Sequence, residues 1–275
     1  IIPSSEIDEI NNMQIETYDA RKLIEQGDSF SFEKIQESKI FNQDIPINEI
    51  INIKDIYQLN NFLKECNYIK KLLTQNKKND SISKHVVKIN DLSELIDLID
   101  LTINENIEIK SSASTTLKKL RKKSLAAYEK LNKDLNKVLS NKDFSNYFQS
   151  DSIRHVSGRL ALEIKSEFKT KFKGIIHGSS SSNNTTFIEP ISTVDICNQW
   201  NDYQNQIREE EIQILKNISN EIIDAQSYIK ENVELASKID LIFAKAKYSK
   251  EIEGNIILKE KNSNQLRLID CKHPL

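Results

Sequence analysis

A helical hydrophobic period runs through residues 194–247 without a proline or a glycine, and it constrains the fold more than any other feature. Apolar residues recur there at spacings of three, four or seven, which is typical of one face of an α-helix. A single helix over this stretch would be roughly 80 Å long. Such a helix cannot bury its apolar face within a small globule, so we expect a second long helix to pack along it.

Residues 114–140 are the predicted partner. Their apolar stripe recurs at threes and fours and comprises Leu117, Leu120, Ala127, Leu131, Leu135 and Val138. The serines between Ser111 and Ser114 offer an N-cap for this helix. We expect the two long helices to run antiparallel. Shorter helices are predicted over 1–27, as a pair within 47–73, and over 92–99.

The hydrophobic period changes between the two long helices. Leu160, Leu162 and Ile164 alternate with polar residues, as in a strand. We expect the alternation to continue over 168–173, with Phe168, Thr170 and Phe172 on one side and Lys169, Lys171 and Lys173 on the other. Further short strands are predicted at 175–177, 185–188, 256–258 and 265–269. We therefore predict a mainly α fold with a small β-rich insert, about 154–190, at the tip of two long antiparallel helices.

Composition and motifs argue against a catalytic centre in this chain. It has only 5 glycines and 4 prolines in 275 residues and lacks the G-x-x-x-x-G-K-[ST], G-x-G-x-x-G and G-x-S-x-G patterns. The four histidines have no metal-ligand spacing, and the acidic run 209–211 is interpreted as a solvated helix face. We expect neither catalysis nor a bound metal or cofactor in this chain itself.

Cysteine usage and hydropathy predict the compartment. Cys66, Cys197 and Cys271 are far apart and form no C-x-x-C pair, which favours reduced thiols and a cytoplasmic location. No run of eighteen apolar residues is present, so no membrane span is expected. The chain begins with Ile1 and stops at Leu275 without a polar tail, and we expect it to be a piece of a longer protein.

Local charge provides the candidate binding residues, because the net charge of the whole chain is only −2. The insert is basic, and we select Arg154, Arg159, Lys165, Lys169, Lys171 and Lys173 as candidate phosphate contacts. His177 joins them because it lies beside a Ser-rich loop, although such a histidine is more often a surface hydrogen-bonding residue. Two interpretations remain equally open for the lysines: contact with phosphates, or solubility and protection of a sheet edge.

A second basic run lies in the predicted partner helix. Residues 118–137 include eight Lys or Arg residues and only two acidic residues, Glu129 and Asp134. Charge complementarity with the acidic run 209–211 is the favoured interpretation. Contact with nucleic acid or a ribosome is the alternative.

The order of these features resembles the MutS family. The segment 158–177, Gly-Arg-Leu-Ala-Leu-Glu-Ile-Lys-Ser-Glu-Phe-Lys-Thr-Lys-Phe-Lys-Gly-Ile-Ile-His, precedes a Ser-rich loop and then Thr-Phe-Ile-Glu-Pro at 186–190. This order is similar to the clamp region of the family's second bacterial branch. Ser-Ser-Ala-Ser at 111–114, Ala-Lys-Ala-Lys at 244–247 and Lys-His-Pro-Leu at 272–275 also resemble that branch. Lys272, where the branch usually has Arg, and the glycine-free loop depart from it.

The resemblance implies an architecture and a set of partners. It implies a helical core at 1–110, long lever helices at 111–150 and 191–250, a β-rich clamp at 151–190, and a return to the core at 251–275. An ATPase domain would follow, so the parent would be a homodimer that uses ATP and Mg²⁺. The family is associated with DNA mismatch repair and recombination, and this branch with branched DNA and with ribosome rescue. The clamp would grip duplex or branched DNA, and the alternative is a structural rod that contacts a ribosome or another protein.

Overall fold

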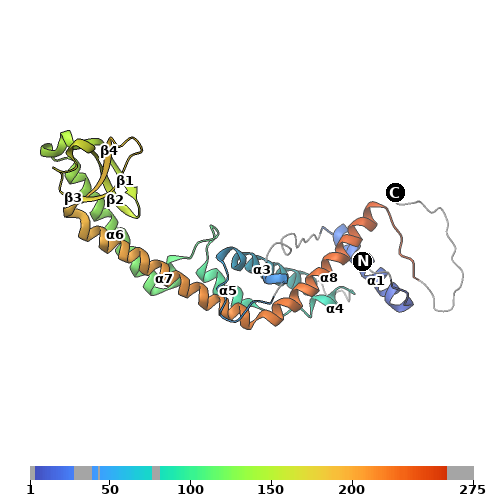
Figure 1. Ribbon diagram of the computed structural model, residues 1–275. Coiled ribbons are helices and arrows are strands. Elements are labelled where there is room, and N and C mark those ends of the chain that lie inside the picture. The colour runs from blue at the N-terminus through green and yellow to red at the C-terminus, as the bar shows by residue number, and fades with distance from the viewer. Residues whose placement is uncertain (1–3, 28–38, 43, 76–80, 259–275) are drawn as a thin grey trace. The chain divides into compact units, whose positions relative to one another are not determined.

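The computed structural model describes residues 4–27, 39–42, 44–75 and 81–258. Residues 109–215 form one compact unit, and the described parts of 1–108 and 216–275 form another. Helices dominate both units, and a four-stranded antiparallel sheet lies in 109–215 (Figure 1). The predicted mainly α class is therefore confirmed.

One unit has helices and no strand within its described residues. Its helices are α1 (Ile7–Glu25), α2 (Lys39–Asn42), α3 (Ile53–Gln75), α4 (Ser83–Val86), α5 (Ser93–Thr102), α8 (Gln226–Glu251) and the last turns of α7 (Val194–Asp224). Helix α8 packs along α1. The Arg21 guanidinium, on α1, donates to the Gly254 carbonyl at 2.7 Å and so holds the chain after α8 against α1.

Helix α3 replaces the two short helices predicted within 47–73. The Asn52 side-chain oxygen accepts a hydrogen bond from the Asp55 amide at 2.9 Å and caps the helix at its start. No glycine or proline follows before the helix ends, so nothing interrupts it. Ile47 and Ile50 precede the cap and are exposed, with 82% and 44% of their surface accessible.

Helices α6 (Thr115–Leu139) and α7 run antiparallel in the unit 109–215. Residues with rising numbers in and just before α6 contact residues with falling numbers in α7. The pairs are Ser114 with Glu210, Ser124 with Gln204, and Tyr128 with Trp200. The buried stripe of α6 is Leu117, Leu120, Ser124, Ala127, Leu131 and Leu135. This stripe follows the helical period of the sequence, with Ser124 added where a hydroxyl meets the Gln204 amide at 2.7 Å.

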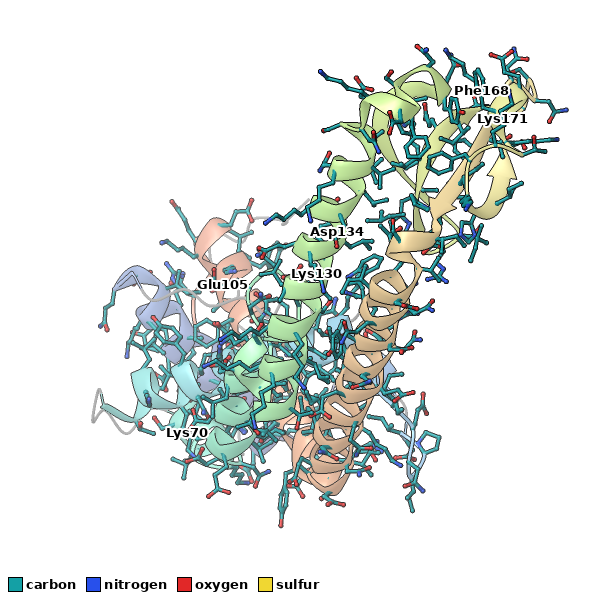
Figure 2. All side chains as sticks on the ribbon, turned by 90° about the vertical axis from the view of Figure 1, so that its left-hand side faces the viewer. Lys70, Glu105, Lys130, Asp134, Phe168 and Lys171 are labelled. Atoms are coloured by element: carbon teal, nitrogen blue, oxygen red, sulfur yellow. The ribbon has the colours of Figure 1, made fainter. Side chains whose placement is uncertain are left out.

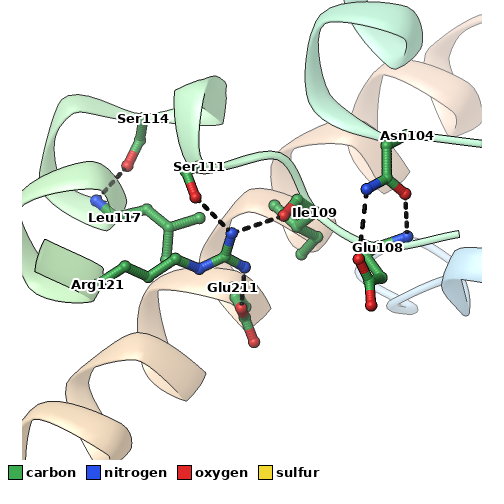
Figure 3. A network of polar contacts seen from close by, with 8 residues as sticks. All are labelled: Asn104, Glu108, Ile109, Ser111, Ser114, Leu117, Arg121 and Glu211. Carbon is green, nitrogen blue, oxygen red and sulfur yellow. Dashed lines mark hydrogen bonds and ion pairs between the residues drawn. The ribbon is translucent and has the colours of Figure 1, made fainter. Parts of the chain in front are cut away.

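The start of α6 is fixed by a cap and by an arginine. As predicted, a serine caps the helix: Ser114 Oγ accepts from the Leu117 amide at 2.8 Å. The Arg121 guanidinium donates to the Ile109 carbonyl and to Ser111 Oγ, both at 2.9 Å, and pairs with Glu211 at 2.7 Å (Figure 3). Arg121 thereby ties the residues before α6 to α7.

The prediction of one unbroken helix over 194–247 is wrong at Ala225. Helix α7 ends at Asp224 and α8 begins at Gln226, because ψ of Ala225 is 1°. The hydrogen bonds on either side persist, from the Ala225 amide to Glu221 O at 3.1 Å and from the Ile229 amide to Ala225 O at 3.0 Å. The helix after the break packs on α1, so 114–140 is not the partner of the whole stretch.

The sheet comprises β1 (Phe148–Val156), β2 (Arg159–Lys165), β3 (Gly174–Ser179) and β4 (Thr185–Pro190) in the order β1-β2-β4-β3. Strands β2, β3 and β4 confirm the predicted strands at 159–165, 175–177 and 185–188. Strand β1 was not predicted. It joins β2 through Ser157 and Gly158, whose φ angles of 50° and 81° fit the two-residue turn that matches strand twist.

One face of the sheet packs against α6 and the start of α7. The core there comprises Leu131, Leu135, Phe148, Leu160, Leu162, Ile164, Phe172, Ile188 and Cys197. Gly174 lets β3 approach β4 closely, since a Cβ at this position would lie 2.3 Å from Ile188 Cγ2.

Two predicted strands are wrong. Residues 168–173 do not alternate along a strand: η3 (Ser166–Phe168) is a turn of 3₁₀ helix, and a turn and bend follow it. Residues 256–258 are not in a strand either. The predicted strand at 265–269 and the Lys-His-Pro-Leu segment at 272–275 lie outside the described residues. The other short 3₁₀ helices are η1 (Ser111–Ala113), η2 (Lys142–Tyr147) and η4 (Ile191–Thr193).

Candidate nucleic-acid interface

A buried carboxylate holds two of the predicted binding residues. Glu189, on β4, is fully buried, and its Oε2 lies 2.7 Å from His177 Nε2 and 3.5 Å from Arg159 Nε. His177 comes from β3 and Arg159 from β2, so one carboxylate links three strands. A buried charge must be paired to be tolerated. These two side chains are therefore engaged within the protein, and Glu189 is the residue that sequence reasoning missed.

Arg154 is engaged in a second polar cluster. It pairs with Glu163, which also accepts a hydrogen bond from Ser150 Oγ at 2.6 Å. The Ser150 hydroxyl, followed by Arg154, holds the pKa of Glu163 below its usual range, although burial acts in the opposite direction. The Arg154 side chain is still 59% exposed, so part of the guanidinium faces solvent. Lys165 lies at the end of β2 and donates to the Asn146 carbonyl at 3.1 Å.

The remaining three candidates lie together in an exposed turn. Lys169, Lys171 and Lys173 are all exposed in the connection between η3 and β3. They are not on one strand face, as predicted; we call residues 166–173 the lysine turn. The Lys171 and Phe172 amides both donate to Phe168 O, at 2.9 and 3.0 Å, which closes the turn. Phe172 anchors it by inserting into the core of the sheet.

An aromatic pair supports the lysine turn. The Phe168 ring stacks on Tyr147 with centroids 4.5 Å apart and an interplanar angle of 9°. The Lys171 ammonium lies 5.7 Å from the centroid of Phe168, and Figure 2 shows these two side chains beside each other at the sheet. The ammonium groups of Lys169 and Lys173 make no ion pair or hydrogen bond with the described residues. The turn thus presents cations on a fixed backbone.

Charge complementarity explains only a small part of the basic run in α6. Arg121 pairs with Glu211, and Lys137 pairs with Asp134 of its own helix. By contrast, the ammonium groups of Lys118, Lys119 and Lys122 are exposed and have no polar partner in the described part of the chain. The favoured interpretation of this run accounts for Arg121 alone. Glu210 of the acidic run accepts instead from Ser114 Oγ at 2.7 Å.

The described residues contain no group of three or more His, Cys, Asp or Glu side chains that would hold a metal ion. Cys66 and Cys197 are both buried, and burial raises the pKa of both thiols, that of Cys66 to about 12. No helix among the described residues is long and apolar enough to cross a membrane.

Comparison with known proteins assigns the family. The chain is 30% identical over 293 residues to Endonuclease MutS2 of Finegoldia magna and 28% identical over 278 residues to that of Ligilactobacillus salivarius. Each alignment covers 99% of this chain. The chain belongs to the MutS2 branch of the MutS family. Endonuclease MutS2 of Caldanaerobacter subterraneus is 31% identical over 90% of the chain.

The alignments cover nearly all of this chain but only part of the length of each relative. The chain spans about a third of the length of the curated MutS2 proteins, between 31% and 35% in these three. No protein-family profile matches the chain. Some of the residues that carry the MutS2 resemblance lie at the ends of elements. Glu189 and Pro190 end β4, and Ser114 caps α6.

Proposed function

We propose that this chain is the lever and clamp part of a MutS2-type protein and that the lysine turn grips the phosphates of DNA. The observation that carries this proposal is the separation of charges in the sheet. Glu163 and Glu189 are engaged by Arg154, Arg159 and His177. Of the predicted binding residues, Lys169, Lys171 and Lys173 are exposed and pair with no carboxylate among the described residues, and the folded backbone holds them together in one turn.

The grip depends on the shape and charge of the nucleic acid. Lysine ammonium groups contact phosphate oxygens, which position a protein but carry no sequence information. Neutralising phosphates releases counterions, so the binding is salt-dependent. Duplex and branched DNA are both candidate ligands. Helices α6 and α7 support the proposed lever role, because they are long and antiparallel and the chain between them forms the sheet.

The whole protein is proposed to hydrolyse ATP with Mg²⁺ outside the described residues and to act as a homodimer, as the MutS resemblance implies. Helices α6 and α7 would then transmit the nucleotide state of the ATPase to the sheet.

Charge reversal tests the grip. Lys169, Lys171 and Lys173 are each changed to Glu, and binding to duplex and to four-way-junction DNA is measured at several salt concentrations. The control changes Lys238, Lys247 and Lys250, three exposed residues of α8, to Glu, so the net charge changes equally. We expect a large loss of affinity in the lysine-turn variant and a small one in the control. Equal losses in the two variants would overturn the proposal.

Ribosome cosedimentation tests the alternative partner. If the lysine-turn variant keeps full DNA affinity but no longer cosediments with ribosomes, the turn is a ribosome contact and the DNA proposal is wrong.

A further inference from the structure

A groove on the α6–α7 pair is not explained by the lysine turn. It has a volume of about 670 Å³, within the roughly 300–1,000 Å³ of small-ligand sites. Leu125, Tyr128, Trp200, Gln204 and Arg208 line it from the two helices, and His155 from β1. All of these residues lie in the unit 109–215.

Three of the residues that line the groove carry aromatic rings. The Tyr128 and Trp200 ring centroids are 5.4 Å apart at an interplanar angle of 42°, and His155 meets Trp200 at 5.8 Å and 79°. Leu125 and Tyr128 are 58% and 39% exposed. Three rings at different angles, beside exposed apolar surface, form a site where a flat π-system can stack. The Gln204 side chain adds an amide that can hydrogen-bond to a polar edge.

Unpaired cations lead into the groove along α6. Lys118, Lys122 and Leu125 follow one another at spacings of four and three, which places them in a row on one side of the helix. Lys118 and Lys122 have no polar partner among the described residues, as noted above. An anionic chain lying along this row would bring its next unit over Leu125 and Tyr128. A ligand with both a flat ring and a phosphate therefore fits better than an apolar peptide.

We propose that the groove binds an unpaired nucleobase of a single-stranded segment, with Lys118 and Lys122 contacting the adjoining phosphates. This rests on the proposed function in one respect, since nucleic acid is the ligand of both surfaces. It adds a preference for branched or gapped molecules, because a base within a duplex is stacked and cannot enter the groove. Base stacking on aromatic side chains tolerates any sequence.

Trp200 reports occupancy directly, because it is the single tryptophan of the chain. The 275-residue chain is titrated with a thymidine oligonucleotide and with an abasic oligonucleotide of equal length and charge. Stacking of a base against the groove quenches the tryptophan fluorescence. We expect quenching by the first ligand and little by the second. Equal quenching by both ligands, or none by either, would overturn the proposal.

Variants connect the signal to the groove. Tyr128→Ala, and separately Leu125→Ala, should weaken single-strand binding by roughly 5- to 100-fold and leave duplex binding unchanged. Tyr228→Ala on α8, where the ring is 51% exposed, is the matched control and should change neither. Both residues changed in the groove are exposed, so the fold should tolerate them. Unchanged single-strand affinity in Tyr128→Ala and Leu125→Ala would contradict the proposal.

Two outcomes separate this proposal from the one on which it rests. If duplex DNA binds through the lysine turn but no base-dependent quenching occurs, only the groove proposal fails. If charge reversal of the lysine turn has no effect while quenching persists, the groove proposal holds and the clamp proposal fails. If Tyr128→Ala lowers the mass of the ligand-free protein in sedimentation, the groove binds a second copy of the chain, and the nucleobase proposal is wrong.

Discussion

His177 Nε2 lies 2.7 Å from Oε2 of the fully buried Glu189. The same oxygen lies 3.5 Å from Arg159 Nε, so strands β2, β3 and β4 share one carboxylate. Removal of one partner from a buried ionic group leaves the remaining charge uncompensated. Residues that looked from the sequence like ligand contacts are in this way part of what holds the sheet together.

Replacement of Glu189 tests this role. Glu189→Ala should lower the free energy of unfolding by about 3–5 kcal/mol, because Arg159, whose side chain is only 20% exposed, loses its counter-ion. Urea denaturation followed by circular dichroism measures the change. Glu167→Ala is the control, since Glu167 is exposed and its loss should cost no more than about 0.5 kcal/mol. If the two variants are equally stable, the buried carboxylate has no structural role.

Gly174→Ala should destabilise the sheet by about 1–3 kcal/mol, a typical cost of overpacking. The new Cβ would lie 2.3 Å from Ile188 Cγ2 and 2.4 Å from Glu189 O, so β3 must shift away from β4. Thermal unfolding detects the loss, with Ser179→Ala in the exposed end of β3 as the comparison. A melting temperature equal to that of Ser179→Ala would show that the two strands are not so closely packed.

Glu163 gives the sheet a pH dependence. Hydrogen bonding by Ser150 and pairing with Arg154 lower the pKa of Glu163 in the folded state. The ionised Glu163 side chain therefore contributes its full share to the free energy of unfolding at pH values above its ordinary pKa of 4.5. That share is lost as the pH falls through the lower pKa that Glu163 has in the folded protein. Glu163→Gln should be about 1–2 kcal/mol less stable than the parent at pH 7.

The difference should shrink as the pH falls below about 4.5, because Glu163 of the parent is then protonated in the unfolded state first and, at lower pH, in the folded state as well. Chemical denaturation at several pH values measures the free energy of unfolding of the parent and of Glu163→Gln. Glu167→Gln is the matched control and should track the parent throughout. A stability difference between Glu163→Gln and the parent that stays constant down to pH 2 would be inconsistent with this origin.

The buried thiols should be chemically inert in the folded protein. Cys66 is fully buried and burial raises its pKa to about 12, so the reactive thiolate is scarce at pH 8. In a Cys271→Ser background, a disulfide reagent should modify Cys66 and Cys197 only when the protein unfolds. Ser145→Cys supplies an exposed thiol for comparison. Modification of Cys66 as fast as the introduced thiol would contradict the buried position.

The hydrophobic period of the sequence correctly predicted those elements in which the buried residues recur at the same period. The α6 stripe and the alternation of Leu160, Leu162 and Ile164 are visible in the sequence because one face of each element is buried. Strand β1 was missed because a bulge between Phe148 and Ile153 breaks its alternation. The lysine turn was mistaken for a strand because Phe168 and Phe172 fit a period of two, whereas their spacing of four closes a helix-like turn.

The pairing of the site residues depends on strand order, which the sequence pattern does not specify. The sequence predicts the cationic residues as candidates by local charge alone, but which of them meet a carboxylate depends on the register of β2, β4 and β3. Glu189 follows Ile188 in a strand that is buried on both sides. Only the sheet brings it to Arg159 and His177, so the structure was needed to distinguish Lys169, Lys171 and Lys173, which are exposed and pair with no carboxylate among the described residues.

The salt dependence of DNA binding tests the central claim most directly. Each phosphate contact contributes about 0.9 to the slope of log association constant against log salt concentration. The protein and its Lys169→Gln, Lys171→Gln, Lys173→Gln variant are titrated with duplex DNA at several salt concentrations. If the lysine turn grips phosphates, the slope should fall by about 2–3 in magnitude. An unchanged slope would contradict the claim that these lysines contact the DNA.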